Sequence, residues 1–323
     1  MRPLAVLFIV FMVATPALTA QTAQLPTFRT ESTLVPIDAQ VIEAGRPLGG
    51  LRVEDFVLRE EGVPRPIVYF GRESEPIQAV LLLDVSGSMG PILRDMAASA
   101  RSALASLQPG DQVAVALFAR HARITLELTP ERDLAVRALK EAPLERSLGA
   151  GTSINEALLD VAAYLESAPP FAGRRAIVIL TDNGGMHYQT PDDKVLRALA
   201  GAGAVLNAIV SPAAKPPSAS SPGANPDFTP ADVFSLASLS GGEVLRAGKA
   251  SAPFQLMLER LRLRYSLAIR PSPAPPGTFL RLQLDLTPDA RRRHPKAEIR
   301  ARAGYYAPQP PSSSLSGFGE PPR

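Results

Sequence analysis

The stretch Ile77-Gln-Ala-Val-Leu-Leu-Leu-Asp84-Val-Ser-Gly-Ser88 decides how this chain folds. Its first part, up to Leu83, is a nearly continuous aliphatic run, which is typical of a β-strand that helices cover on both faces. A polar turn follows at once and carries one carboxylate and two hydroxyls. In open α/β sheets, ligands bind outside the carboxyl ends of the strands. The stretch therefore predicts a buried strand with a candidate binding site at its end.

Strands and helices alternate along the chain after this stretch. Apolar residues at helical spacing predict helices over residues 92–107, 131–140, 153–165, 192–202, 231–239 and 253–263. Between them, strands are expected over residues 112–118, 123–128, 176–180, 205–210 and 243–245. This order predicts an α/β fold with a doubly wound, mostly parallel, Rossmann-like sheet.

Antiparallel β segments flank this region on both sides, because short alternating strands are separated by Gly and Pro turns. The expected organisation is a signal peptide over 1–20, an N-terminal β segment over 21–75, the α/β domain over 76–264, a C-terminal β segment over 265–308 and a disordered tail over 309–323. Residues 211–229 are rich in Pro, Ser, Ala and Gly and predict a surface loop. We hypothesise that the two β segments pack together as one unit.

The N-terminus has the features of an export signal. Arg2 precedes the apolar run Leu4 to Val13, Pro16 interrupts it, and small residues such as Ala20 follow. An uncleaved N-terminal anchor is the alternative reading. The remaining chain has no apolar run of membrane-spanning length. We expect an exported protein, in the periplasm, on the cell surface or in the medium, without a transmembrane span after cleavage.

Composition excludes several classes of function. The chain has no Cys, which rules out thiol catalysis and Cys-based metal sites. Its three His residues lie in separate segments, which argues against a zinc site built on His. A formal net charge of +3 is too small to indicate nucleic-acid binding.

Oxygen-bearing side chains recur where strands end or helices begin. They are Asp84, Ser86 and Ser88 in the first turn, Thr152 before the helix 153–165, and Asp182 after the strand 176–180. A set with oxygen alone suits a hard cation, Mg²⁺ foremost, with Mn²⁺ or Ca²⁺ possible. Ser86 and Ser88 can point at one ion, and Asp84 can accept from a metal-bound water. Gly87 is expected to let the turn close without a side chain that obstructs the ion. One coordination position is left for water or an anionic group.

These residues resemble the metal-ion-dependent adhesion site (MIDAS) of von Willebrand factor A domains. The resemblance rests on the DxSxS pattern at Asp84, the Thr152 of Gly149-Ala-Gly-Thr-Ser153 and the Asp182 of Leu-Thr-Asp. It implies that Ser86, Ser88 and Thr152 bind the metal directly while both Asp residues act mainly through water. It also implies a protein partner whose Asp or Glu carboxylate completes the coordination.

The likeness extends to the flanking segments. Asp55-Phe56, Tyr69-Phe70, Tyr265-Ser-Leu and Arg302-Ala-Gly-Tyr-Tyr-Ala-Pro308 resemble the VWFA-related family described from Acidobacteria. One position departs from the pattern of A domains, in which Gly often follows the third-motif Asp. Here Asn183 comes first, and Gly184-Gly185 follow.

Other interpretations stay open. Thr152 could cap its helix, and the A domain could be a scaffold that uses no metal. A subtilisin-like serine hydrolase would need a His base within reach of Ser153, and His121 lacks the flanking glycines of that family. We therefore expect a protein that is not an enzyme.

Three further segments carry structural expectations. The basic run from Arg291 to Lys296 is expected to form a solvated hairpin loop, and His187-Tyr188 to lie in a loop. Met89 is expected to pack beneath the turn.

Overall fold

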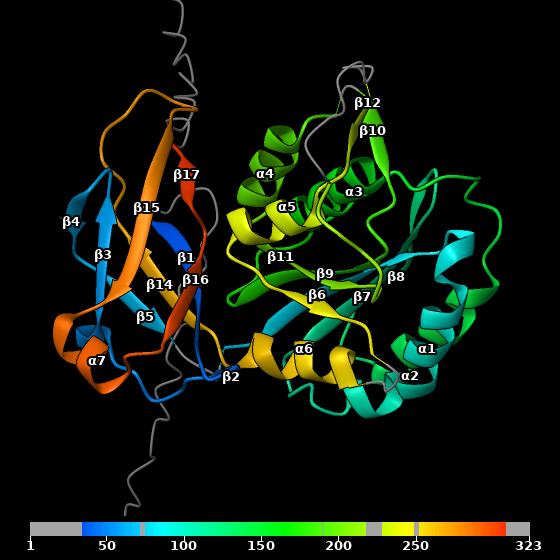
Figure 1. Ribbon diagram of the computed structural model, residues 1–323, viewed down its shortest axis with the longest axis horizontal. Coiled ribbons are helices and arrows are strands. Elements are labelled where there is room, and N and C mark those ends of the chain that lie inside the picture. The colour runs from blue at the N-terminus through cyan, green and yellow to red at the C-terminus, as the bar shows by residue number, and fades with distance from the viewer. Residues whose placement is uncertain (1–33, 72–74, 189, 218–227, 249–251, 308–323) are drawn as a thin grey trace, which may run out of the picture.

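The computed structural model describes residues 34–71, 75–188, 190–217, 228–248 and 252–307. The predicted signal peptide, the tail after 308 and most of the predicted loop 211–229 lie outside the described residues. Figure 1 shows an α/β domain and a β-rich unit side by side. No helix of the described part is long and apolar enough to cross a membrane.

The α/β domain is built on a six-stranded sheet with the order β13-β11-β9-β6-β7-β8. Its strands are β6 (Ile77–Asp84), β7 (Gln112–Phe118), β8 (Ala122–Thr129), β9 (Arg174–Thr181), β11 (Ala204–Val210) and β13 (Val244–Arg246). All neighbours pair in parallel except β7 and β8, which form an antiparallel edge. The mostly parallel sheet predicted from the sequence is confirmed.

Helices cover both faces of this sheet (Figure 1). One face packs against α1 (Gly90–Leu104), α2 (Arg132–Glu141) and α6 (Ala252–Arg262), and the other against α3 (Ile154–Ser167), α4 (Asp192–Gly201) and α5 (Val233–Ser240). Along β6, Leu81 and Leu83 enter the first core while Val80 and Leu82 enter the second. This two-sided burial explains why β6 has an aliphatic run instead of an alternating pattern.

One element of the domain differs from the sequence-based expectation. His187 and Tyr188 belong to β10 (Met186–Tyr188), which pairs antiparallel with β12 (Phe228–Pro230). The predicted loop at this place is wrong, since the pairing partner comes from about forty residues further along and has no local signal in the sequence.

The β-rich unit joins the two flanking segments of the chain. One sheet has the order β16-β1-β14-β5 with β2 beside β1, and the other has the order β17-β15-β3-β4. The N-terminal segment supplies β1 (Val35–Glu43), β2 (Arg46–Pro47), the 3-10 turn η1 (Val53–Asp55), β3 (Phe56–Glu60), β4 (Val63–Arg65) and β5 (Tyr69–Gly71). The C-terminal segment supplies β14 (Tyr265–Ile269), β15 (Phe279–Leu286), α7 (Pro288–Arg293), β16 (Glu298–Ala301) and β17 (Gly304–Tyr306). Strands from both ends pair directly, β1 with β14 and β3 with β15, which agrees with the hypothesis of one β unit.

The basic run does not form the predicted hairpin loop. Its first residues belong to the short helix α7, which Thr287 caps by accepting a hydrogen bond from the Ala290 amide. Arg291 and Arg293 form ion pairs with Asp285 and Asp55. The run is thus packed into the β unit, where the nearby Asp285 and the distant Asp55 pair with two of its arginines.

Buried charges join the two units. Arg264, 2% exposed, forms an ion pair with Asp38 of β1 and donates to the Gly241 carbonyl after α5 at 2.6 Å. Glu243 accepts from Gln40 at 2.7 Å and from Arg260 at 2.5 Å. Charged groups removed from water must find partners, so these pairs fix one orientation of the units.

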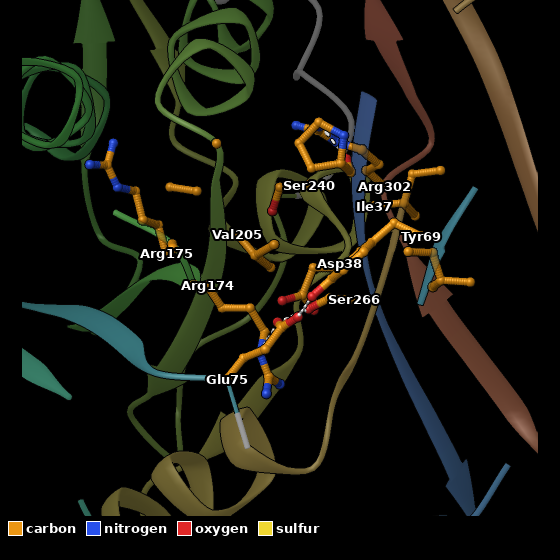
Figure 2. Close-up of a pocket in the computed structure, with 16 residues that line it drawn as sticks. Ile37, Asp38, Tyr69, Glu75, Arg174, Arg175, Val205, Ser240, Ser266 and Arg302 are labelled. Atoms are coloured by element: carbon orange, nitrogen blue, oxygen red, sulfur yellow. Dashed lines mark hydrogen bonds and ion pairs between the residues drawn. The ribbon is translucent and has the colours of Figure 1, made fainter. Parts of the chain in front are cut away.

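A small cavity of about 60 Å³ lies at this junction. In Figure 2, Asp38, Glu75, Arg174 and Ser266 gather along it. Ser266 and Tyr69 donate hydrogen bonds to Glu75, and the Arg174 guanidinium lies 3.4 Å from the same carboxylate. The cavity is therefore lined by polar groups that already bind one another.

Candidate metal centre

Asp84 ends β6 and is fully buried. The amide of Val85 donates to the Phe118 carbonyl at 2.8 Å, which holds the turn against the end of β7. Met89, also fully buried, anchors the 3-10 turn η2 (Gly87–Met89) from below, as predicted. The exposed side of the turn is left to Ser86 and Ser88.

The backbone of the turn does not require a glycine at Gly87. Its φ is not in the left-handed region, and an added Cβ would meet no heavy atom within 4 Å. The turn therefore closes without needing a glycine here, and the expectation that Gly87 keeps a side chain clear of the ion stays a prediction.

Both oxygens of Asp84 are held in place. Oδ1 accepts from the Ser86 amide at 2.9 Å, and Oδ2 accepts from the Thr181 hydroxyl at 2.8 Å. Burial raises the pKa of Asp84 above its usual value, although the hydrogen bonds from Ser86 and Thr181 oppose this change and the nearby Asp182 adds to it. A cation at this place would offset the cost of keeping the carboxylate charged.

Ser86, Ser88 and Asp182 form a continuous set of oxygens. The two hydroxyl oxygens lie 3.3 Å apart, and Ser88 Oγ donates to Asp182 Oδ2 at 2.6 Å. Ser88 and Asp182 come from different loops, which the parallel pairing of β6 with β9 brings to the same sheet edge. The predicted meeting of the first and third motifs is therefore observed.

Asn183 shapes the loop that carries Asp182. Its φ of 59° lies in the left-handed region, which Gly and Asn tolerate better than other residues. Its side chain donates to the Lys215 carbonyl at 3.1 Å and accepts from the Val233 amide at 3.0 Å. Asn183 thus supports the loop in place of the Gly that A domains often have there, while the Gly184 amide donates to Asp182 Oδ1 at 2.9 Å.

The backbone of Thr152 lies against the loop that follows Asp182. A Cβ on Gly185 would lie 2.5 Å from the Thr152 carbonyl oxygen, so the two loops touch at a position that only Gly fits. In the described part of the chain, the Thr152 hydroxyl forms no hydrogen bond to the other four candidate residues. Thr152 also does not cap α3, because Ser153 occupies the N-cap position and makes no side-chain cap.

The donor set fits a hard cation. A hydroxyl such as Ser88 Oγ that donates its proton to a carboxylate keeps lone pairs for a metal ion, and that carboxylate then orients it. No cluster of three His, Cys, Asp or Glu side chains suitable for a metal occurs among the described residues. The candidate site therefore depends on hydroxyls, with Asp84 and Asp182 as its carboxylates.

Sequence reasoning assigned no role to three residues that organise this site: Thr181, Asn183 and Gly185. Thr181 stands directly before Asp182, and Gly185 belongs to a Gly pair directly after it, so the signal was present but ambiguous. A hydroxyl at a strand end and a Gly in a loop are common features of any fold.

The hydrolase alternative needs a histidine paired with Ser153. Ser153 donates its backbone amide to the Ala119 carbonyl at 2.8 Å, and His121 donates its amide to Leu148 at 3.0 Å. Within the described ranges, no hydrogen bond joins the Ser153 and His121 side chains.

Fold and site together define an α/β domain with an oxygen-rich cluster at the carboxyl edge of a parallel sheet. The family model for the von Willebrand factor type A domain matches residues 79–185, a range that contains all five candidate ligands. The chain therefore contains a von Willebrand factor type A domain. No curated protein matches the chain.

Several solved structures are similar to this chain. An aerotolerance-related membrane protein from Bacteroides fragilis is 20% identical, with 57% of this chain and 98% of that chain covered and a TM-score of 0.44. A von Willebrand factor type A protein from Catenulispora acidiphila is 16% identical, with 90% and 77% covered and a TM-score of 0.42. Proximal thread matrix protein 1 from the mussel byssus, with a zinc-occupied MIDAS motif, is 17% identical, with 64% and 50% covered and a TM-score of 0.42. The likeness to the acidobacterial family stays a prediction.

Proposed function

We propose that this protein binds a protein partner through a divalent cation, and that it is not an enzyme. The ligands would be Ser86, Ser88 and Thr152 directly, with Asp84 and Asp182 mainly through water. The observation that carries the proposal is the hydrogen bond of 2.6 Å from Ser88 to Asp182, because it joins two loops into one oxygen-only cluster. When bound, the cation supplies a Lewis-acidic position that accepts a carboxylate oxygen of the partner.

The chain's own residues prepare this position in distinct ways. Asp84, buried and bound by Ser86 and Thr181, fixes the turn and supplies negative charge behind it. Asp182 orients the Ser88 hydroxyl. Since hydroxyls are neutral and the carboxylates number only two, a divalent ion would keep an attraction for a further acid.

Oxygen ligands favour Mg²⁺, with Mn²⁺ or Ca²⁺ as alternatives. The five side chains include no basic nitrogen that could activate a nucleophile, which supports binding over catalysis. We further propose that the protein acts outside the cytoplasm, on the strength of its N-terminal residues. Cell fractionation of the full-length chain tests this, and recovery only with cytoplasmic proteins would contradict it.

Calorimetric titration with Mg²⁺, Mn²⁺ and Ca²⁺ tests the metal site directly. We expect heat of binding from the wild type and none from Ser86→Ala or Asp84→Ala. Ser102→Ala, which removes an exposed hydroxyl from α1 far along the helix, is a matched control and should bind like the wild type. Circular dichroism verifies that each variant is folded.

The absence of heat from a folded wild-type protein would favour the alternative of a metal-free scaffold. Affinity capture from an envelope extract, with and without chelator, then tests the partner. Partner binding that chelator leaves unchanged would contradict the cation bridge.

A further inference from the structure

A groove of about 260 Å³ continues from the candidate metal centre across the surface of the α/β domain. Ser86 and Gly87 line one end of it. The loop before α3 forms the opposite wall, and Leu93 and Leu148 contribute apolar side chains. A partner that places a carboxylate at Ser86 would therefore extend into this groove.

One arginine lines the groove and two more lie against residues that line it. Arg146 lines it, and its guanidinium donates to the Pro143 carbonyl at 2.9 Å and to the Glu145 carbonyl at 2.5 Å. Arg120 packs on Gly149, where an added Cβ would lie 3.1 Å from the Arg120 Cβ. Arg94 Nη1 lies 3.5 Å from the position of a Cβ on Gly90, which also lines the groove.

The charge of these arginines is not neutralised within the described part of the protein. Arg94, Arg120 and Arg146 are exposed, and none forms an ion pair with a described acidic side chain. The one acid that lines the groove, Glu145, forms an ion pair with Arg123 and accepts from the Ser147 amide. The groove therefore presents positive charge around an apolar floor.

Leu144 gives the rim an exposed apolar side chain. It ends the 3-10 turn η3 (Ala142–Leu144), between two residues that line the groove, and is 75% exposed. No other large hydrophobic side chain in the described ranges is as exposed. Leu144 therefore offers an apolar contact beside the groove.

We propose that this groove binds an acidic segment of the partner protein. One carboxylate of the segment would reach the metal, further acids would contact Arg120 and Arg146, and an apolar residue would pack on Leu144. The inference rests on the proposed cation-dependent binding and adds the sequence character of the ligand. Opposite charges across an interface supply specificity and faster association.

Fluorescence anisotropy with two short labelled peptides tests the proposal. One peptide has a single Asp among Gly and Ser, and the other adds two Glu and one Leu after that Asp. In Mg²⁺, we expect the full-length protein to bind the second peptide about fivefold more tightly, a difference that shrinks at high salt. Arg146→Glu and Arg120→Glu should abolish the difference, because binding of the second peptide falls by more than that of the single-acid peptide.

Arg281→Glu is the matched control, because this arginine is exposed on β15 of the β unit, away from the groove. Equal affinity for both peptides, or a preference that Arg146→Glu leaves intact, would overturn the proposal. Tighter binding of an oligonucleotide of equal charge would also overturn it. Failure of the proposed function has a different signature, since Mg²⁺ would then give no heat in calorimetry and no peptide would bind in a chelator-sensitive way.

Discussion

The Thr181 hydroxyl donates a hydrogen bond of 2.8 Å to Asp84 Oδ2, and both side chains are fully buried at the ends of neighbouring strands. The register that pairs Leu83 of β6 with Leu180 of β9 brings the two residues together. Thr181 also accepts from the Asn183 amide at 3.1 Å, so one hydroxyl connects the loop after Asp84 to the loop that carries Asp182. The sheet thereby aligns the two loops.

The first prediction follows from this hydrogen bond. Thr181→Val keeps the shape of the side chain but removes the donor to Asp84, so we expect affinity for Mg²⁺ to fall about tenfold. Calorimetric titration measures the change. Thr125→Val, which removes a hydroxyl bonded to a backbone carbonyl on the edge strand β8, should leave affinity unchanged. Wild-type affinity in Thr181→Val would show that Asp84 needs no support from β9.

Gly185 gives the second prediction. In Gly185→Ala, the new Cβ would clash with the Thr152 carbonyl, so the two loops must separate. We expect weaker metal binding and a loss of about 1 to 3 kcal/mol in unfolding free energy. Gly248→Ala, whose Cβ would meet nothing within 4 Å, is the control for urea unfolding and titration. Unchanged metal affinity in Gly185→Ala would exclude Thr152 from the site.

The third prediction concerns pH and the β unit. Burial of Glu60 tends to raise its pKa, but hydrogen bonds from Ser272 and Tyr305 outweigh burial and hold the pKa below its usual value of 4.5. A carboxyl with a lower pKa in the folded state stabilises the protein above its unfolded pKa, and this contribution is lost as the pH falls below about 4.5. Glu60→Gln should therefore be less stable by about 1 to 3 kcal/mol at neutral pH.

Urea unfolding from pH 7 to pH 3 measures this difference. The difference in unfolding free energy between the wild type and Glu60→Gln should narrow as the pH falls. Protonation of Glu60 in the wild type removes the same charge that the substitution removes. A gap that stays constant across this range would contradict the assigned role of Glu60.

The fourth prediction concerns the junction between the units. Arg264→Ala removes a buried guanidinium and leaves Asp38 and the Gly241 carbonyl without this partner. We therefore expect the unfolding free energy to fall by about 3 to 5 kcal/mol. Arg281→Ala removes an exposed ion pair with Glu61, which solvent screens, and should leave the unfolding free energy almost unchanged. Chemical unfolding measures both, and equal effects would show that the buried pair does not stabilise the junction.

Much of the fold could be predicted from local patterns. The aliphatic run of β6 and the helical spacing of apolar residues in α1 mark the side chains that each element buries. Such a pattern lies within one element, so it can be recognised without knowing the neighbouring elements. The β10–β12 ribbon could not be predicted, because its second strand, Phe228–Pro230, lies about forty residues further along the chain. Helix α7 does have a local signal, the Thr287 cap followed by Pro288, which the run of arginines after it obscured.

The sequence by itself determined the alternating α/β order and the types of side chain that follow β6 and β9. Only the tertiary structure decided which of them meet. It joined Ser88 to Asp182, supported Asp84 with Thr181, and placed the Thr152 backbone against Gly185. The physical reason is that periodicity reports burial of an element along the chain, whereas contacts between loops depend on strand register and on the close approach that a glycine permits.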